Sequence, residues 1–262
     1  MKILITGARS GIAFLTGITL AYRGHFVYMT THTKKEAIRL KEITDPMKLR
    51  IMVFKLDITN EEERKILNTL DIDVLINNAG IGIGGSILDV PMNEVRKNFE
   101  VNYFSSYDIV RRVGNRMIKN NKNGKIIIMS STAGIIPIPF LGIYCSTKSA
   151  ISTMATSLQK ELKTLKSNVK VVLIEPGGYK TGFNQNMIDD IEKHITDDSV
   201  FYNDREKIHN NLYTAFNLIE KRKTNSIVAK IIQAVEEKNP KKKYRAPLLQ
   251  RIFTRFYLIF LK

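Results

Sequence analysis

The stretch Ile3-Leu4-Ile5-Thr6-Gly7-Ala8-Arg9-Ser10-Gly11-Ile12-Ala13 combines an apolar run, a glycine turn and the start of a helical pattern. Around it, apolar periodicity predicts strands at about 2–6, 26–30 and 51–56, separated by helices at about 12–23 and 34–43. Such alternation is typical of parallel strands joined by right-handed crossovers. We therefore expect one α/β domain, doubly wound, with a parallel sheet of about seven strands and helices on both faces.

Composition limits the alternatives. The 262 residues are 44% hydrophobic, which is ample for a buried core, and no segment resembles a linker. Cys145 is the lone cysteine, so an internal disulfide is excluded and a reducing compartment is expected. The chain enters a strand without an apolar signal segment, which also favours a cytoplasmic protein. The four histidines are scattered and predict no metal site.

The net charge of +16 favours acidic partners: nucleotide phosphates, anionic lipid, an acidic carrier protein or nucleic acid. No recognised nucleic-acid module is apparent, so we regard nucleic acid as the least favoured of these.

In the first turn, Gly7 and Gly11 would let the backbone approach a pyrophosphate, and the following helix would offer free N–H groups to it. The alternative is a purely structural turn, but a strand before it and a helix after it favour phosphate binding. Three further strands are predicted at 74–76, 125–129 and 169–174. The first two are followed directly by Asn77-Asn78-Ala79-Gly80 and by Ser130-Ser131.

A second motif, Tyr144-Cys145-Ser146-Thr147-Lys148, opens a long helical pattern. Tyr144 and Lys148 are four residues apart and share one helix face. An ammonium stabilises phenolate and lowers the phenol pKa from about 10, which makes this pair a candidate acid–base group. The alternative is a surface lysine packed over a tyrosine. Ser131, between a strand end and a helix start, could face the same cleft.

These motifs, in this order and spacing, resemble the short-chain dehydrogenase/reductase family from residue 1 to about residue 181. The resemblance implies a Rossmann-type catalytic domain at 1–246, with a variable helical lid over the substrate at about 183–223. It implies four catalytic residues, Asn102, Ser131, Tyr144 and Lys148. It also implies a cofactor site made of Gly7, Arg9, Ser10, Gly11, Ile12, Thr31, His32, Asp57, Asn78, Ala79, Gly80, Tyr144, Lys148, Pro176, Gly177 and Thr181.

Two of these positions, Asn102 and Asp57, carry alternatives, and a position outside the set, Ala13, departs from the family pattern. Asn102, in a helix expected at about 92–120, would hold a water linked to Lys148 in the family, or would be a structural amide. Asp57 would contact adenine in the family, or would cap the helix that starts near Asn60, or both. Ala13 stands where the family usually has its third glycine, which a site that only governs helix–strand packing tolerates.

The second strand leads into Thr30-Thr31-His32-Thr33-Lys34-Lys35, which contains no carboxylate to bind a ribose 2′-hydroxyl. Arg9 can fork onto phosphate, and the resemblance implies that Arg9 with Thr31 or His32 holds a 2′-phosphate. We therefore expect NADP(H) rather than NAD(H). The alternative for Arg9 is an exposed guanidinium with no partner.

The resemblance implies hydride transfer between NADP(H) and a small-molecule carbonyl or alcohol. The apolar loop 134–141, between Ser131 and Tyr144, would form a wall of the substrate site or pack on another subunit. It favours an apolar or lipid-derived ketone or aldehyde. A 3-oxoacyl-carrier reductase and a non-catalytic NADP(H)-binding regulator remain as alternatives. Related proteins form dimers or tetramers, so a homo-oligomer is expected.

Residues 247–262 predict a basic amphipathic helix. Gln250, Arg251, Thr254 and Arg255 share one face, and apolar residues cover the other. At ~1.5 Å per residue the segment is too short to cross a ~30 Å hydrocarbon core. It could lie on an anionic membrane surface as a peripheral anchor, pack on its own domain, or pack on a partner subunit.

Overall fold

The computed structural model describes residues 1–260; Leu261 and Lys262, the last two residues of the predicted C-terminal helix, lie outside the described residues. Its centre is a sheet of seven parallel strands in the order β3-β2-β1-β4-β5-β6-β7. The strands are β1 Lys2–Ile5, β2 Phe26–Thr31, β3 Ile51–Lys55, β4 Val74–Asn77, β5 Lys125–Met129, β6 Lys170–Pro176 and β7 Lys243–Ala246. The predicted doubly wound α/β fold is confirmed.

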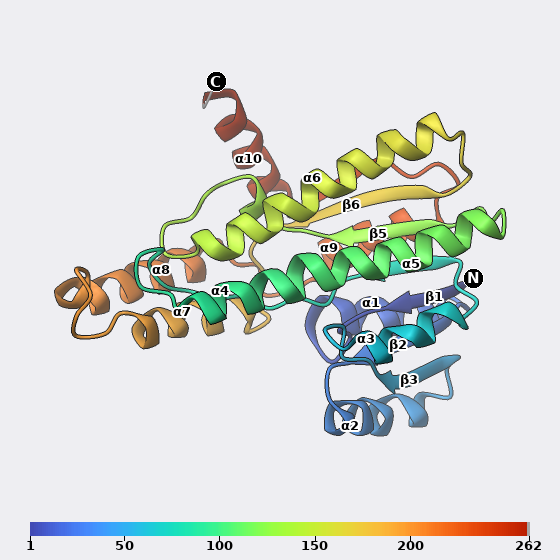
Figure 1. Cartoon of the computed structure of the whole chain (residues 1–262), viewed down its shortest axis with the longest axis horizontal. Coiled ribbons are helices and arrows are strands. Elements are labelled where there is room, and N and C mark those ends of the chain that lie inside the picture. The colour runs from blue at the N-terminus through green and yellow to red at the C-terminus, as the bar shows by residue number, and fades with distance from the viewer. Residues whose placement is uncertain (261–262) are drawn as a thin grey trace.

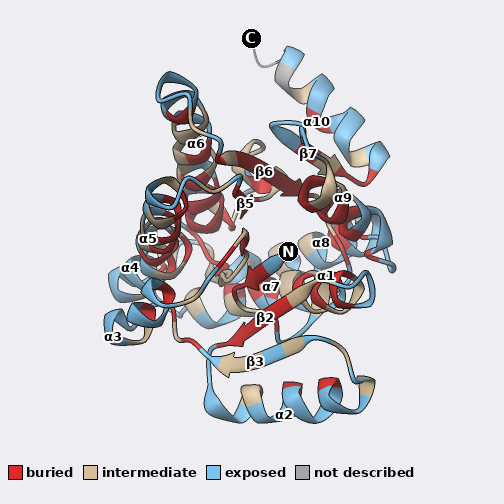
Figure 2. Ribbon diagram, turned by 90° about the vertical axis from the view of Figure 1, so that its right-hand side faces the viewer, coloured by how far each residue is buried: buried red, intermediate tan, exposed pale blue. Residues whose placement is uncertain are grey.

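Helices cover both faces of this sheet (Figures 1 and 2). One face carries α1 Gly11–Tyr22, α2 Lys34–Thr44 and α9 Asn225–Glu236, and the other carries α3 Glu61–Arg64, α4 Met92–Phe99, α5 Ser106–Lys119 and α6 Gly142–Thr164. Successive strand residues therefore enter different cores: Ile3 and Ile5 face the α1–α9 layer, and Leu4 faces the α5–α6 layer. Burial on both faces explains why these strands are continuous apolar runs.

Helix α1 meets the sheet most closely at a residue other than the one expected. Ala13, at the family's usual third glycine, is buried without conflict. At Gly17, one turn further on, a β-carbon would lie 2.8 Å from the Met29 sulfur on β2. The close helix–strand approach thus occurs at Gly17, which explains why a methyl group is tolerated at position 13.

The helix expected at 92–120 is interrupted. Helix α4 ends at Phe99, a π-helical turn (η3) spans Glu100–Ser105, and α5 begins at Ser106. Such turns arise where the regular hydrogen-bond ladder gives way to another set of contacts, and they are frequent at functional sites. This one contains Asn102, and its side-chain contacts, described below, show what replaces the regular ladder.

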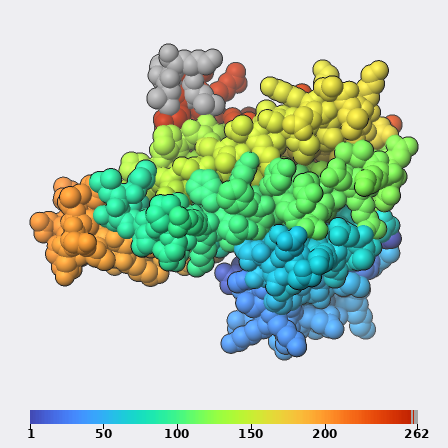
Figure 3. All heavy atoms as spheres, in the orientation of Figure 1, coloured from blue at the N-terminus to red at the C-terminus, as the bar shows by residue number. Residues whose placement is uncertain are grey.

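Beyond the carboxyl edge of the sheet the chain forms α7 Phe183–His194 and α8 Arg205–Ile219, which project from one end of the molecule (orange in Figure 3). These helices occupy the segment predicted as a lid. Strand β7, in the basic stretch after α9, then completes the sheet beside β6, and α10 Leu248–Phe260 follows it. The sequence did not locate β7, because its four residues are too few to show a strand pattern.

A largely buried ionic cluster ties α5 to α3 and to the loop that precedes it. Asp108 accepts hydrogen bonds from the Nε atoms of Arg64 (2.8 Å) and Arg112 (2.6 Å), and Arg64 also donates to the Ile58 carbonyl at 2.6 Å. Burial acts to raise the pKa of Asp108, but the hydrogen bonds from Arg112, Arg111 and Arg64 outweigh it and lower the pKa to about 2. The charged carboxylate therefore stabilises the fold.

We predict that Asp108→Asn lowers the free energy of unfolding at pH 7 by about 2 kcal/mol, because it leaves buried arginine donors poorly paired. The native pKa lies below the ordinary value, so the stabilisation is complete above about pH 4 and is lost toward pH 2. Urea unfolding at several pH values measures this, with Asp197→Asn, at an exposed site, as the control. A deficit that did not shrink on acidification would contradict the assignment.

Candidate active site

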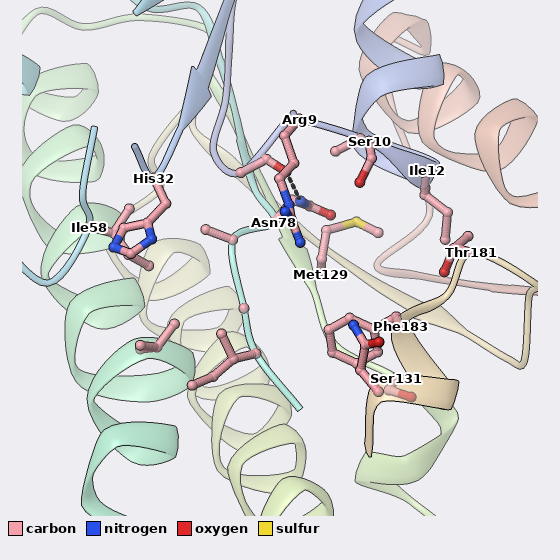
Figure 4. A pocket seen from close by; sticks show the side chains of 18 of the residues that line it. Arg9, Ser10, Ile12, His32, Ile58, Asn78, Met129, Ser131, Thr181 and Phe183 are labelled. Carbon is pink, nitrogen blue, oxygen red and sulfur yellow. Dashed lines mark hydrogen bonds between the residues drawn. The ribbon is translucent and has the colours of Figure 1, made fainter. Parts of the chain in front are cut away.

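A cavity of about 710 Å³ opens where the carboxyl ends of the central strands meet, a size typical of cofactor clefts. Its wall includes every residue predicted to bind the cofactor, together with Ser131, Tyr144 and Lys148. Figure 4 shows His32 and Ile58 at one end of this cavity and Ser131 and Phe183 at the other. Of the predicted site residues, Asn102 alone is absent from the wall.

The glycine turn is held in shape by the Asn77–Gly80 segment. The Thr6 hydroxyl accepts hydrogen bonds from the backbone N–H groups of Asn78 (2.9 Å) and Ala79 (3.0 Å). The Asn78 amide donates in return to the Thr6 carbonyl at 3.0 Å and to the Gly7 carbonyl at 3.2 Å. Gly7 has a φ of +66°, and a β-carbon there would lie 2.8 Å from the Ala79 Cα. Glycine is thus required at position 7 by this contact as well as by its backbone conformation.

The N-terminus of α1 suits a pyrophosphate. Gly11, with a φ of +64°, begins the helix, and the Ser10 hydroxyl before it makes no capping hydrogen bond. The free N–H groups and the positive end of the helix dipole therefore face the cavity beside an available hydroxyl. The acidic residues of the cavity wall, Glu36 and Asp57, lie elsewhere, so this part of the wall fits an anionic group.

The end of the cavity that was predicted to bind a 2′-phosphate contains the Glu36 carboxylate, which the sequence analysis missed. Arg9 pairs with Glu36 at 3.0 Å, so the prediction that Arg9 might be exposed without a partner is wrong. Glu36 also accepts from the Thr33 backbone N–H at 3.1 Å, completing a capping box at the start of α2. The Thr33-x-x-Glu36 spacing could have indicated that capping box. Thr31 is buried, and its hydroxyl donates to the Thr33 carbonyl at 3.1 Å.

Asp57 does not cap a helix. Asn60 is the N-cap of α3, and the capping prediction for Asp57 is wrong. The Asp57 carboxylate instead accepts from the Thr59 N–H (2.9 Å) and hydroxyl (2.7 Å), and its other oxygen lies 3.3 Å from His32 Nε2. Burial acts to raise the Asp57 pKa, but the bonds from Thr59 and the nearby His32 lower it overall. Asp57 therefore places His32 at this rim of the cavity.

Three polar residues converge at the opposite end. Tyr144 and Lys148, on the first turns of α6, are only 7% and 6% exposed, which excludes a surface lysine packed over a tyrosine. The Lys148 ammonium donates to the Met129 carbonyl at 3.2 Å and lies 5.7 Å from the centre of the Tyr144 ring. Ser131 begins η4 (Thr132–Gly134), which packs tightly on α6: a β-carbon at Gly134 would lie 2.7 Å from the Lys148 carbonyl oxygen.

Burial dominates the electrostatics of this pair. Burial raises the pKa of the Tyr144 phenol well above its ordinary value, and a hydrogen bond with Ser131 acts in the opposite direction. Burial also lowers the pKa of Lys148 to about 8. The predicted lowering of the Tyr144 pKa by the lysine is therefore wrong: burial raises that pKa, and the phenol is protonated at neutral pH. Such opposed shifts in one cleft are typical of acid–base sites.

Asn102 lies outside the cavity wall and bonds to two segments that form the site. Its amide nitrogen donates to the Ile81 carbonyl (2.8 Å) and the Thr147 hydroxyl (3.0 Å), and its oxygen accepts from the Ile81 N–H at 2.8 Å. Thr147 in turn donates to the Tyr144 carbonyl at 2.8 Å. The Asn102 side chain is thus satisfied by protein groups, as in the structural alternative, and it links the glycine-rich loop to the turn that carries Tyr144. Sequence reasoning missed Thr147, although it lies inside the motif.

A packed apolar cluster adjoins Tyr144. The Phe183 ring of α7 lies 5.7 Å from the Tyr144 ring, centre to centre. Around them the loop after Ser131 and the helices α6, α7 and α8 contribute a buried cluster of Ala133, Leu141, Cys145, Met187, Ile188 and Phe216. The glycine-rich loop at 80–85 packs directly on this cluster, because a β-carbon at Gly82 or Gly84 would collide with Met187. Among residues 1–260, no three His, Cys, Asp or Glu side chains gather into a metal site.

Comparison with known proteins agrees with this geometry. A family model described as short chain dehydrogenase matches residues 1–192. The chain belongs to the short-chain dehydrogenase/reductase family. It is accordingly an NAD(P)-dependent oxidoreductase that acts on CH–OH and C=O groups.

Two relatives and one solved structure indicate where the chain falls within this family. A 3-ketodihydrosphingosine reductase of Bacteroides thetaiotaomicron is 32% identical, over 97% of this chain and 90% of that protein. An NADPH-dependent 3-dehydrocapnine reductase of Ornithobacterium rhinotracheale is 33% identical, over 68% of this chain and 65% of that protein. A short-chain dehydrogenase/reductase of Burkholderia phymatum, solved with NAD, superposes with a TM-score of 0.82 at 20% identity, over 97% of this chain and 91% of that one. The last comparison concerns the fold alone.

We predict that Lys148→Met leaves the protein folded and raises its free energy of unfolding at pH 7, by on the order of 1–3 kcal/mol. The lysine pKa is about 8 in the folded protein and near 10.4 when unfolded, so below pH 8 folding must hold a charge in a buried site. The advantage of the variant is thus greatest below pH 8 and shrinks as pH rises toward 10.5. Denaturant unfolding measures it, with the exposed Lys160→Met as control; a less stable variant at pH 7 would contradict it.

Proposed function

We propose that the protein uses NADPH to reduce the ketone of an apolar, lipid-derived substrate. The observation that carries the proposal is the placement of Tyr144: one side meets Ser131 and Lys148, and the other meets the buried apolar cluster under α7 and α8. Phe183 of α7 belongs to this apolar surrounding and also lines the cavity beside Tyr144, which suits a substrate with an acyl or alkyl chain rather than a charged metabolite. The similarity to a 3-ketodihydrosphingosine reductase over 97% of the chain supports the same substrate class.

The nicotinamide cofactor, when bound, supplies the hydride. The cavity end at Tyr144 is where the substrate carbonyl would lie, and Ser131 would donate a hydrogen bond to its oxygen as negative charge develops. Tyr144, whose raised pKa keeps it protonated at neutral pH, would then give that oxygen a proton. Lys148 would hold the cofactor ribose and restore the proton of the phenol. Asn102 would act by positioning Thr147 and the backbone of Ile81.

The reaction is tested by NADPH oxidation with 3-ketodihydrosphingosine, simple apolar ketones and aldehydes of increasing chain length, and 3-oxoacyl thioesters on a carrier protein. We expect the long-chain ketones to be the best substrates. Tyr144→Phe should lower kcat by about 10²–10⁴-fold with little change in NADPH affinity, because it removes only the proton donor. Tyr22→Phe, at an exposed site on α1, is the control.

Each result of this assay is decisive. A preference for carrier-bound thioesters would replace the lipid ketone with the 3-oxoacyl substrate, which the basic surface of the protein could accommodate. Turnover retained by Tyr144→Phe would contradict the assignment of the acid. A wild-type protein that binds NADPH but turns over none of these compounds would favour a non-catalytic regulator.

We also propose that NADP(H) is preferred over NAD(H). Arg9 lies at the rim of the cavity with an exposed guanidinium, and His32 lies across from it (Figure 4). Glu36 opposes a 2′-phosphate, but its bond to Arg9 is an exposed pair of small strength, which a phosphate can replace. The NADPH-dependent 3-dehydrocapnine reductase is a relative with this preference.

Binding titrations test the cofactor proposal. We expect a lower Kd for NADPH than for NADH, and we expect Arg9→Gln to raise the NADPH Kd by about 10-fold while changing the NADH Kd little. Glu36→Gln should tighten NADPH binding, because it removes the competing charge and keeps a capping side chain at position 36. Arg39→Gln, on the exposed side of α2, is the matched control. Tighter binding of NADH by the wild type would overturn the proposal.

A homo-oligomer is the quaternary structure that we propose, through the face formed by η3 and α5. Phe104 and Tyr107 expose 54% and 46% of their surface there, an apolar area that a second subunit could bury.

A further inference from the structure

Helix α10 stands away from the rest of the molecule, at the top of Figure 1, and most of its surface is coloured as exposed in Figure 2. It is attached along one side only. Thr254 is 1% exposed, and the Gln250 side chain accepts from the Gly178 N–H at 2.7 Å and donates to the Ile219 carbonyl at 2.6 Å. These contacts fix the helix to the loop after β6 and to the last residue of α8.

The opposite side of α10 is a broad apolar face. It consists of six large side chains that are 41–68% exposed: Leu248, Leu249, Ile252, Phe253, Phe256 and Ile259. The helix therefore packs on its own domain along its polar side only, and the domain leaves this apolar face uncovered. Exposed apolar faces of this extent mark sites of protein or membrane interaction.

Positive charge borders the apolar face. At 100° per residue, Arg251 and Arg255 lie between the attached side and the apolar side, and both are exposed. Residues 247–262 contain no aspartate or glutamate. At the foot of the helix, Lys221 bonds through its backbone N–H to the Gly178 carbonyl at 3.1 Å, and it begins the exposed basic run Lys221–Lys223. Leu218 and Ile219, just before it, are 82% and 50% exposed.

We propose that α10 is an interfacial anchor that binds the surface of an anionic lipid bilayer. The apolar face would enter the boundary between headgroups and acyl chains, and Arg251 and Arg255 would reach the phosphates from its edge. Thirteen residues of helix extend only about 20 Å, so α10 lies along the surface. No helix within residues 1–260 has the length and apolarity needed to cross a bilayer.

Charge distinguishes a bilayer from the other occupant, a second copy of this chain. Two copies of α10 meeting face to face would bring four arginines together, on subunits that each carry a net charge of +16. An anionic membrane instead attracts each basic residue near its surface. The observed combination, an apolar face with an arginine border and no acidic residue, is complementary to lipid and self-repelling toward a copy of itself.

This position also bears on catalysis, if the substrate is lipid-derived as proposed above. Gln250 bonds to the backbone beside Gly177, a residue of the cavity wall, and to the end of the lid helix α8. Docking of α10 would therefore place the lid end of the cavity near the membrane. Membrane binding itself does not depend on this consequence and is measured without substrate.

Sedimentation of the full-length protein with vesicles tests the anchor. We expect binding to vesicles of mixed phosphatidylcholine and phosphatidylglycerol, much weaker binding to phosphatidylcholine alone, and weakening with salt. Phe253→Glu with Phe256→Glu should raise the vesicle Kd by more than about 30-fold. Arg251→Gln with Arg255→Gln should raise it by about fivefold per arginine.

Matched controls use the end of the sheet at which the strands begin, because α10 follows the carboxyl end of β7. Tyr22→Glu with Leu165→Glu changes two apolar residues that are 67% and 60% exposed there, and Lys160→Gln with Lys163→Gln removes two exposed charges from α6. These variants should bind like the wild type, apart from a small general effect of net charge. NADPH binding and thermal unfolding, unchanged in all variants, would show that the α10 substitutions leave the domain folded.

Several outcomes would overturn the proposal. These are no binding of the wild type to anionic vesicles, or binding that survives both the α10 substitutions and deletion of residues 248–262. Equal loss in the control variants would indicate a general charge effect rather than an anchor. A change of oligomeric mass in the α10 variants, with vesicle binding intact, would assign the apolar face to a second copy of the chain. Because these readouts do not involve turnover, they fail or succeed independently of the proposed reaction.

Discussion

The contact between the ends of β1 and β4 is the constraint on which the site depends. The two strands are neighbours in the sheet, although 68 residues separate Ile5 from Val74. The chain leaves β1 for one face of the sheet and returns on the other face after β4, so a crevice must open between the two connections. The close approach of Gly7 to Ala79, bonded through Thr6 and Asn78, forms the floor of that crevice. Every other feature of the site is arranged around this opening.

The acid–base role proposed for Tyr144 and Lys148 depends on their burial. Both are buried at the start of a long helix, where water cannot solvate a charge, and their pKa values shift in opposite directions as a result. The surrounding structure holds them there through contacts with their backbone rather than with the phenol or the ammonium: Gly134 against the Lys148 backbone, and Asn102 through Thr147 to the Tyr144 carbonyl. The π-helical turn at 100–105 presents Asn102 to both partners.

Apolar side chains are buried in the core of the domain but exposed on one face of α10. Both faces of the sheet are covered, and the cluster beside Tyr144 is closed by α7 and α8. Helix α10, by contrast, uses its polar side chains Gln250 and Thr254 for attachment and leaves the six large apolar side chains of the face described above exposed. A helix that only stabilised the domain would bury these residues and expose the polar ones. This inverted orientation supports the proposal that the apolar face binds a surface outside the domain.

The sequence alone determined the features that depend on a few consecutive residues. Apolar runs and glycine turns located six of the seven strands to within two residues, and the Ser131, Tyr144 and Lys148 motifs identified one wall of the cavity correctly. Periodicity also recognised α10 as amphipathic. These signals are local, because helix periodicity, strand periodicity and turn residues are each recognised within a window of about ten residues.

Only the tertiary structure decided which of these local features meet. The pairing of Arg9 with Glu36, the bonds from Asn102 to Ile81 and Thr147, and the tight packing at Gly17 and Gly134 join residues that no local pattern relates. The interruption of the helix at 100–105 likewise depends on other elements, because Asn102 in that turn bonds to Ile81 and Thr147. Which side of α10 faces solvent was also undetermined by periodicity, which shows that a helix has two faces but not what each one contacts. That choice depends on the backbone of Gly178 and Ile219, 72 and 31 residues away from Gln250.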